Sequence, residues 1–236
     1  MSDYSFPTAR ARRGRVRMTR FERHEQLIDV ARGLFAEKGL DGTSVEEIAA
    51  HAGVSKPVVY EHFGGKEGLY AVVVDREVTT LHTAIKTALA TNAGPRALIE
   101  RGTLALLDYI DDHADGFRII SRDSTTESGG PAAGGVGVGG TAGSTASFAT
   151  ILSDIASRVE DQLADEFVKR DRDPATAPLY AQMLVGLVAL AGQWWVDNRS
   201  GMTKPEVAAH LVNLMWYGIR SLQPQPTLRF APNQAQ

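Results

Sequence analysis

The sequence predicts an all-α protein, with a small N-terminal domain of three short helices followed by a larger helical domain. Apolar residues recur at spacings of three and four along most of the 236 residues. Ser, Thr and Pro stand where helices would begin, and Gly stands where several would end. With 43% hydrophobic residues, the chain can bury a core in both parts.

A basic arm precedes the first expected helix. Residues 1–20 hold six arginines against one acid, Asp3, on a chain whose formal net charge is −3. The arm is either a solvated, disordered tail or a segment that neutralises phosphates. In the second case Arg13, Arg15 and Arg17 would suit a narrow minor groove of DNA, whose negative potential attracts arginine.

The first helix is expected over residues 21–38. Gly39 would end it, and Asp41-Gly42 would form a turn. Five apolar residues share one face of this segment: Leu27, Ile28, Ala31, Leu34 and Phe35.

A second helix begins near Thr43 and Ser44. Thr43 with Glu46, or Ser44 with Glu47, makes a capping box. The apolar positions that follow are spaced as on one side of a helix, and Gly53 ends the segment.

A third helix follows across a tight turn. Gly53 permits the left-handed conformation that the turn needs, Ser55 suits the N-cap, and Pro57 falls in the first turn, where its missing N–H costs nothing. This helix is therefore expected over residues 56–63. Two short helices across such a turn form a helix-turn-helix, whose second helix places its N-terminal part in a DNA major groove.

A fourth helix is expected from Lys66 to about residue 90. The charge of Lys66 opposes the helix dipole at this N-terminus, and a bound phosphate would offset the penalty. Lys66 is either an ordinary solvated residue or a phosphate contact, and the nearby Tyr60 and His62 favour the contact.

The rest of the chain is expected to be almost entirely helical. Residues 124–147 are an exception, because this Gly-, Ser-, Thr- and Ala-rich run has no apolar period and indicates a flexible loop. Further helices are expected over residues 95–113, 115–122, 148–169 and 174–198, and a last helix, capped by Thr203 and Glu206, is expected to run to about residue 222. The expected parts of the chain are the arm 1–20, a helix-turn-helix domain 21–66, a larger domain 67–222 and a tail 223–236.

The composition and motifs argue against an enzyme, a metal site or a cofactor. The chain has no Cys, and its six His lack ligand spacing. No G-x-S-x-G, H-E-x-x-H or G-K-[ST] motif is present. Residues 137–142 formally fit G-x-G-x-x-A, but a Gly-, Ser- and Pro-rich lead-in replaces the strand that a dinucleotide site needs, which favours a loop.

The stretch from Thr43 to Leu69, TSVEEIAAHAGVSKPVVYEHFGGKEGL, resembles the DNA-binding domain of TetR-family transcriptional regulators. A capped Thr-Ser start, then Ala-Gly-Val-Ser, Tyr-x-His-Phe and Lys-x-x-Leu, follow one another at the family's spacing. The resemblance covers about residues 21–70, and the C-terminal part is similar in general shape.

The resemblance implies a homodimer of all-α subunits whose larger domain binds a small molecule. It assigns phosphate contacts to Thr43, Ser44, Lys56, Tyr60, His62 and Lys66, with Ser55 at the start of the recognition helix in the same DNA-binding set. It places Pro57, Val58 and Val59 against base edges, mainly thymine methyls. These three residues donate no hydrogen bond to a base, so apolar contact, DNA shape and the arm would carry the specificity.

Charge adds a requirement for DNA binding. Residues 21–65 hold four Lys and Arg against eight Asp and Glu. We therefore expect the acids to face away from DNA and the arm to assist.

The uncharged stretch 174–196 invites a transmembrane interpretation. Its uninterrupted apolar run, 183–192, is shorter than the ~20 residues that a membrane helix needs. A helix buried on several sides fits better, and in the family the last two long helices form a four-helix bundle with their counterparts. The dimer-interface candidates, each of which could equally be core, are Gly186, Ala189, Gly192, Trp194, Trp195, Met215 and Trp216.

Apolar residues of the middle helices are candidates to line an effector pocket. The stretch from Tyr109 to Arg118 is similar to actinobacterial TetR-type regulators of lipid metabolism, some of which sense acyl-CoA. Arg118 or Arg122 would pair either with an anionic head group or with Asp115 and Asp123. Arg118 is thus the charged candidate of the pocket, and the apolar candidates, each of which could be ordinary core, are Leu106, Tyr109, Ile110, Phe117, Ile151, Leu152, Ile155, Leu184 and Leu187.

The sequence thus predicts a cytoplasmic, homodimeric, ligand-responsive regulator, most simply a repressor that binds a palindromic operator and is released by a small hydrophobic effector such as acyl-CoA. A transcriptional activator or a co-repressor-dependent regulator of the same fold is the alternative. An enzyme using the helical domain, and an adaptor whose helix-turn-helix binds only protein, fit the residues less well.

Overall fold

The computed structural model describes residues 18–90, 93–127, 148–223 and 226, and it is helical throughout its regular elements. The all-α prediction is confirmed for this part of the chain. The elements in chain order are α1 (Arg20–Lys38), α2 (Val45–Ala52), α3 (Lys56–Phe63), α4 (Lys66–Leu89), α5 (Pro95–Asp112), α6 (Ala114–Glu127), α7 (Phe148–Lys169), the 3₁₀ turn η1 (Pro174–Thr176), α8 (Ala177–Asp197) and α9 (Lys204–Arg220).

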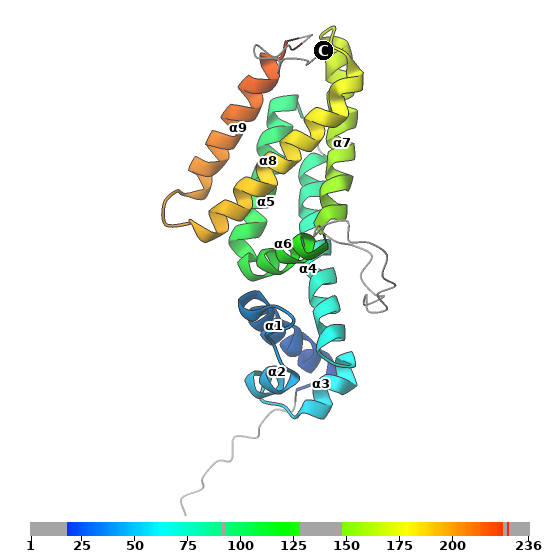
Figure 1. Ribbon diagram of the computed structural model, residues 1–236, viewed down its shortest axis with the longest axis vertical. Helices are drawn as coiled ribbons and strands as arrows, with labels where there is room; N and C mark the ends of the chain where they lie inside the picture. Colours follow the sequence, from blue (N-terminus) through cyan, green and yellow to red (C-terminus); the bar gives the residue numbers. More distant parts are fainter. Residues whose placement is uncertain (1–17, 91–92, 128–147, 224–225, 227–236) are drawn as a thin grey trace, which may run out of the picture.

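Helices α1, α2 and α3 form a small unit at one end of the elongated molecule (Figure 1). Helix α4 begins in this unit and continues into the larger domain, where α5, α7, α8 and α9 run roughly along the long axis. Helix α6 lies across the end of the larger domain and packs against α1. Helices α4 and α6 therefore connect the two parts of the molecule.

Helix ends follow the local signals, with differences at the end of α6 and at the start of α8. Ser44 caps α2, since its hydroxyl accepts from the Glu47 N–H at 3.1 Å, whereas the Thr43 side chain turns inward. Helix α6 continues to Glu127, five residues beyond its expected end. The stretch expected as one helix from residue 174 begins instead with the 3₁₀ turn η1, because Pro178 has no N–H to donate to the Pro174 carbonyl, which accepts from the Ala177 N–H.

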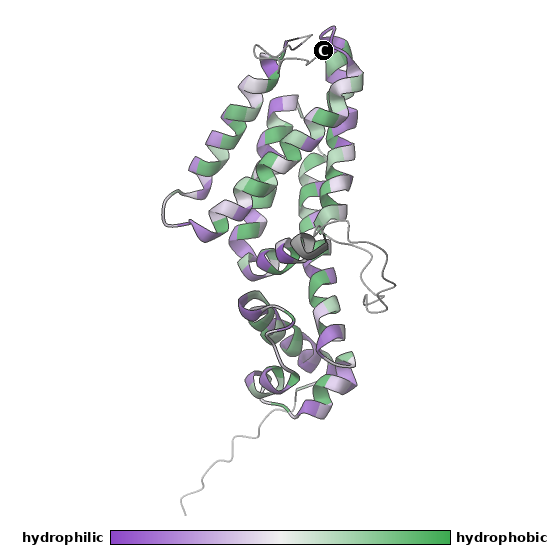
Figure 2. Cartoon of the chain, viewed as in Figure 1, coloured by the Kyte–Doolittle hydropathy of each residue, from purple (hydrophilic) through white to green (hydrophobic). Residues whose placement is uncertain are grey.

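One continuous apolar core runs from α1 through α4 into the larger domain. In the small unit, Leu27, Phe35 and Ile48 are almost fully buried. In the larger domain Leu107, Ile110 and Phe117 are buried to the same degree. Figure 2 shows apolar and hydrophilic residues alternating along most helices, while α8 is apolar over much of its length.

Candidate nucleic-acid interface and ligand cavity

The turn between α2 and α3 has the geometry of a helix-turn-helix. Gly53 adopts the left-handed conformation (φ 63°, ψ 36°), and the Val54 N–H donates to the Ala49 carbonyl at 2.9 Å. Val59 is fully buried and anchors α3 in the apolar core. The Gln26 amide donates to the Ala52 carbonyl at 3.2 Å, which ties α1 to the end of α2.

Ser55 stands at the N-cap of α3, but its hydroxyl makes no capping hydrogen bond. Pro57 occupies the second helical position and has no N–H to donate. The next N–H, that of Val58, donates at 3.0 Å to the Ser55 carbonyl oxygen instead. The exposed Ser55 hydroxyl is therefore available to a ligand.

The structure brings most of the predicted DNA contacts to one end of the molecule. Val58 and His62 are half-buried there, and His62 lies beside the ring of His24, 5.8 Å between centroids. The exposed members of the set are Ser44, Ser55, Lys56, Pro57 and Tyr60.

Two residues of the predicted DNA-binding set point inward. Val59 is fully buried and cannot reach a base edge. It is the residue through which the eight-residue helix α3 packs into the core. Thr43 is 2% exposed, and its hydroxyl donates to the Gly39 carbonyl at 2.7 Å. These two side chains are corrected from DNA contacts to structural residues.

Lys66 has a structural role that its sequence position did not indicate. Its ammonium donates to the carbonyl oxygens of Leu40 and Thr43 at 3.0 and 3.2 Å. It thereby fixes the connection between α1 and α2 to the start of α4. An ammonium has three protons, so one remains for a phosphate.

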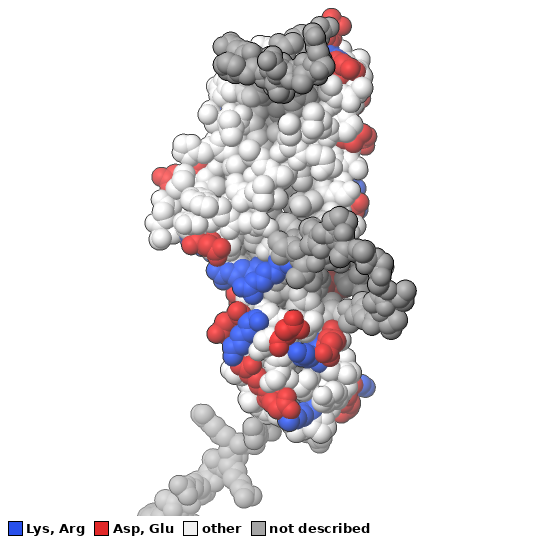
Figure 3. Space-filling view, viewed as in Figure 1, with Lys and Arg blue, Asp and Glu red and all other residues white. Residues whose placement is uncertain are grey.

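The acids of the small unit do not all face away from the candidate DNA contacts. Glu46 pairs with Lys56, and Glu47 pairs with Lys38. The hydrogen bond from Lys56 holds the pKa of Glu46 below its ordinary value, and Lys38 does the same for Glu47. Figure 3 accordingly shows acidic and basic side chains interspersed on the visible face of this unit. The expectation that acids point away is wrong for Glu46.

Arg13, Arg15 and Arg17 lie outside the described residues. Their contact with DNA stays a prediction from sequence.

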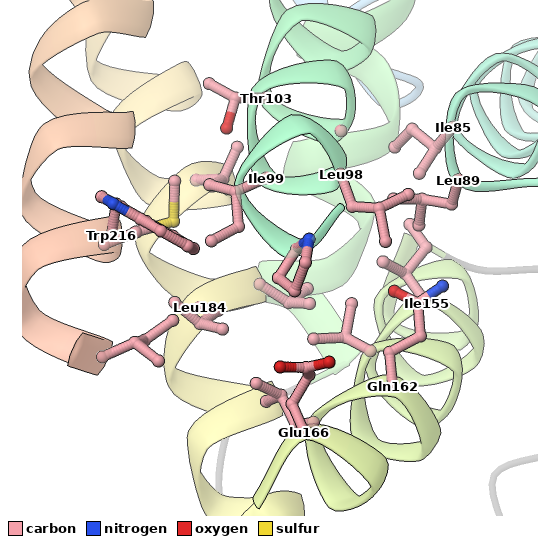
Figure 4. Close-up of a pocket in the computed structure, with 18 of the residues that line it drawn as sticks. Ile85, Leu89, Leu98, Ile99, Thr103, Ile155, Gln162, Glu166, Leu184 and Trp216 are labelled. Atoms are coloured by element: carbon pink, nitrogen blue, oxygen red, sulfur yellow. The ribbon is translucent and has the colours of Figure 1, made fainter. Parts of the chain in front are cut away.

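A cavity of about 340 Å³ lies within the larger domain (Figure 4). Apolar side chains of α4, α5, α7 and α8 form most of its wall. Five of the ten predicted pocket residues line it: Leu106, Ile151, Leu152, Ile155 and Leu184.

The other five predicted pocket residues lie elsewhere. Tyr109, Ile110 and Phe117 are buried in the core beside the cavity. Leu187 is half-buried against the same core, and Arg118 lies within 3.6 Å of both Asp115 and Asp197. The sequence pattern marked these positions as inward-facing, but it could not separate core from cavity wall.

Several cavity residues were not predicted. Met215 and Trp216 of α9, which the sequence left open between dimer interface and core, line the cavity. Leu81, Ile85 and Leu89 add a wall from α4, which the 3.6-residue period of that helix could have indicated. The polar lining residues, from the last two turns of α7 and beyond, are Gln162, Asp165, Glu166, Lys169, Arg170 and Arg172.

A second, smaller cavity of about 270 Å³ lies between α6 and α8 and is lined by Arg118 and Arg122. Arg122 also donates to the Ala36 carbonyl of α1 at 2.7 Å. Both arginines therefore have protein partners at the contact between the two domains, away from the apolar cavity.

The remaining dimer candidates divide into buried and accessible residues. Trp195 is 3% exposed and donates from its indole nitrogen to the Met202 carbonyl at 2.9 Å. Ala189 is also buried, and a Cβ on Gly192 would lie 2.7 Å from Ile110, so α8 approaches α5 closely at this glycine. Gly186 is half-buried, and Trp194 is 52% exposed.

Within the described residues, no group of three or more His, Asp or Glu side chains is placed to hold a metal ion.

Two family models match the chain. The model for the bacterial regulatory proteins of the tetR family matches residues 27–73, and the model for the tetracyclin repressor-like C-terminal domain matches residues 84–227. The HTH-type transcriptional activator FasR of Mycolicibacterium smegmatis is 31% identical over 218 residues, which cover 90% of each chain.

Solved structures share the fold. The crystal structure of a TetR-like transcriptional regulator from Rhodococcus sp. RHA1 has a TM-score of 0.65 at 23% identity, covering 87% of this chain and 100% of the other. The ketosteroid transcriptional regulator KstR2 of Mycobacterium tuberculosis has a TM-score of 0.61 at 19% identity, covering 83% and 94%.

The helix-turn-helix and the matches to both domains define the class of protein as a DNA-binding transcriptional regulator rather than an enzyme. The chain belongs to the TetR family, whose members bind DNA operators, form dimers and bind small-molecule effectors.

Proposed function

We propose that this protein is a cytoplasmic, homodimeric repressor that binds a palindromic operator and is released by a small hydrophobic effector. The observation that supports the effector most directly is the apolar cavity of about 340 Å³ within the larger domain. Cavities of this size and lining are typical of small-molecule sites.

The proposed DNA surface consists of Ser44, Ser55, Lys56, Tyr60 and His62. Lys66, which also donates to the Leu40 and Thr43 carbonyls, adds a phosphate contact through its remaining proton. Hydroxyl, phenol and ammonium groups contact phosphates and set the register of a helix in the major groove. Pro57 and Val58 remain for apolar base contact, because Val59 is committed to the core. Arg13, Arg15 and Arg17 extend this surface into the minor groove.

An exposed apolar surface supports the homodimer. On α8, the side chains of Leu179, Met183, Leu190 and Trp194 are 57%, 56%, 67% and 52% exposed, and their spacing places them on one face. The neighbouring α9 adds Leu214 and Tyr217, which are 60% and 55% exposed. Figure 3 shows few charges on the face over α8 and α9. Contiguous apolar patches of this kind mark interfaces.

The same surface explains a membrane-like signal. The stretch Pro174–Asp197 is long and apolar enough to cross a membrane, and only 22% of the 18-residue window that meets this test is buried. A second subunit would cover the remaining apolar face, so no membrane is needed to account for it. We therefore place the protein in the cytoplasm without a membrane partner.

The proposed signal passes through α4. This helix begins at Lys66 in the DNA-binding domain, and its last turns, with Leu81, Ile85 and Leu89, line the cavity. An effector that displaces these side chains moves a helix that also positions the recognition helix. Release of DNA requires that the effector bind preferentially to the state with the altered spacing of recognition helices. Acyl-CoA is the leading candidate for the effector.

A transcriptional activator is the second candidate. FasR, whose similarity extends over both domains, is named as an activator. The position of the operator relative to the promoter decides between the two outcomes.

Genome-wide recovery of the DNA bound by this protein, followed by transcript measurements in a deletion strain, tests the proposal. A repressor predicts a palindromic site near the start of transcription and raised transcripts from neighbouring genes on deletion. Lowered transcripts would favour the activator. An absence of any enriched palindrome would contradict DNA regulation by a symmetric dimer.

A further inference from the structure

We propose that the hydroxyl of Thr103 binds an oxygen atom at the far end of the effector. The effector is then an elongated apolar acid that carries a hydroxyl or carbonyl group remote from its anionic head. This inference rests on the proposed role of the cavity and adds the chemistry of its ligand.

Thr103 is anomalous in its surroundings. It lies in the middle of α5, it lines the cavity, and it is 2% exposed. Its hydroxyl has no hydrogen-bond partner among the described residues. Buried hydroxyls in native proteins almost always have a partner, and one that lacks it points to a ligand or to a functional strain. In Figure 4 this oxygen points toward the cavity.

The wall around Thr103 offers it nothing to bond. Leu81, Leu106 and Ile151 are among the apolar residues that line the cavity with Thr103, whose hydroxyl has no partner in the described part of the chain. A purely aliphatic ligand would leave the hydroxyl unpaired, whereas a ligand oxygen at this position would accept or donate a hydrogen bond in a dry environment.

The charged end of the cavity lies away from Thr103. Glu166 and Gln162 stand on the opposite side of the cavity from Thr103 in Figure 4. Along α5, Thr103 lies eight positions after Pro95, which lines the cavity where that helix begins, a rise of about 12 Å. A ligand that reaches both ends must therefore be elongated.

The charges at that end favour an anionic head group. Glu166 lies 3.0 Å from Lys169 and 3.4 Å from Arg170 and so neutralises part of their charge. Arg172 donates instead to the carbonyl oxygens of Ile219 and Arg220 at 3.0 and 3.2 Å, and its charge is not matched by a carboxylate in the described part of the chain. Three cations against Asp165 and Glu166 leave an excess of one positive charge.

The test uses a matched pair of probes, palmitic acid and its ω-hydroxy derivative, titrated calorimetrically into the full-length protein below their aggregation limits. The two probes share head group and chain length and differ only in the terminal oxygen. The variants are Thr103→Val, which keeps the shape and removes the hydroxyl, and Thr103→Ser, which restores a hydroxyl. Thr83→Val, at an exposed position of α4, is the control for the same chemical change outside the cavity.

The proposal predicts that the wild type and the Thr83→Val variant bind the ω-hydroxy acid about five-fold more tightly than palmitic acid. Thr103→Val should reverse the preference, because the ligand hydroxyl is then buried without a partner. Thr103→Ser should restore the original order.

A preference for palmitic acid in the wild type, or a preference that Thr103→Val leaves unchanged, overturns the inference while leaving the hydrophobic effector site intact. That outcome would mean that the Thr103 hydroxyl turns to a backbone carbonyl of its own helix. Binding of neither acid would overturn both this inference and the fatty-acyl form of the proposed function.

Discussion

The phenol of Tyr109 on α5 donates a 2.8 Å hydrogen bond to the carboxylate of Glu77 on α4, and both side chains are almost fully buried. The other carboxylate oxygen of Glu77 lies 3.3 Å from the guanidinium of Arg32 on α1. One carboxylate therefore joins the DNA-binding domain, the connecting helix and the ligand domain. Removing one partner of such a carboxylate leaves a buried charge with too few partners, which lowers the stability of the folded protein.

The first prediction concerns alkaline stability. Burial, with the Glu77 charge as a second cause, raises the pKa of Tyr109 above its ordinary value of 10.0. The phenol ionises in the unfolded chain above that pH but stays protonated in the folded protein, so unfolding releases a proton. The free energy of unfolding should therefore fall above pH 10 by up to ~1.4 kcal/mol per pH unit from this group.

Tyr109→Phe should flatten this dependence by up to one proton, measured by denaturant unfolding at closely spaced pH values above 10. The exposed Tyr217→Phe variant, 55% exposed in the wild type, is the control and should keep the wild-type slope. Equal slopes in the Tyr109→Phe variant and the wild type would show that the phenol is not protected in the folded state.

The second prediction concerns Gly116 on α6. A Cβ at this position would lie 2.1 Å from a carboxylate oxygen of Glu77 and 2.9 Å from its Cγ. Gly116→Ala should therefore displace the buried carboxylate and destabilise the protein by about 2 kcal/mol or more. Gly33→Ala on α1, where no atom lies within 4 Å of the added Cβ, should instead be neutral or stabilising by up to ~1 kcal/mol. Thermal unfolding of both variants checks the contrast, and equal effects would contradict the close contact.

The third prediction concerns Glu46. Because Glu46 pairs with Lys56, a DNA phosphate must compete with this carboxylate for the ammonium. Glu46→Gln should therefore tighten DNA binding several-fold at low salt, and the gain should shrink as salt screens both interactions. Fluorescence anisotropy with labelled operator measures the affinity.

Asp161→Asn, which makes the same charge change at an exposed site on α7, is the control and should leave DNA affinity near wild type. A loss of affinity in the Glu46→Gln variant would mean that the Glu46–Lys56 pair positions the lysine rather than competing for it.

The fold followed closely from local signals, because those signals act within a few residues. Gly53 and Pro57 set the start of α3, and the predicted bounds of 56–63 agree with the structure. Proline and glycine restrict the backbone directly, so tertiary packing rarely overrides them. Helix α6 continues past its predicted end at residue 122, because no Gly or Pro stands between residues 122 and 127 to stop it.

Only part of the DNA surface and of the cavity lining could be predicted from the sequence, because the residues at each site depend on which faces of different helices pack together. Val58 and Val59 are both valines in the first half of α3, so the sequence does not distinguish them. Their packing does, because Val59 is fully buried and Val58 is half-buried. The sequence left Met215 and Trp216 open between dimer interface and core, and only the packing of α9 shows that both line the cavity. The unpaired state of Thr103 likewise depends on neighbours distant in sequence.

The fourth prediction concerns the arm. Deleting residues 1–17 removes five of the six arginines of the first 20 residues and leaves α1 and its Thr19 cap intact. DNA affinity at physiological salt should fall at least ten-fold, about 1.4 kcal/mol, with an unchanged melting temperature. Equal affinity of the truncated and full-length proteins would identify the arm as a solvated tail.

The most direct test of the account measures the separation of the two recognition helices in the dimer. The chain has no Cys, so Glu61→Cys on α3 provides a unique spin-label site in each subunit. In the DNA-competent state the two helices must enter successive major grooves roughly 34–36 Å apart. The account predicts that palmitoyl-CoA shifts the measured distance distribution while lowering operator affinity. An unchanged distribution alongside a real loss of affinity would contradict transmission through movement of α4.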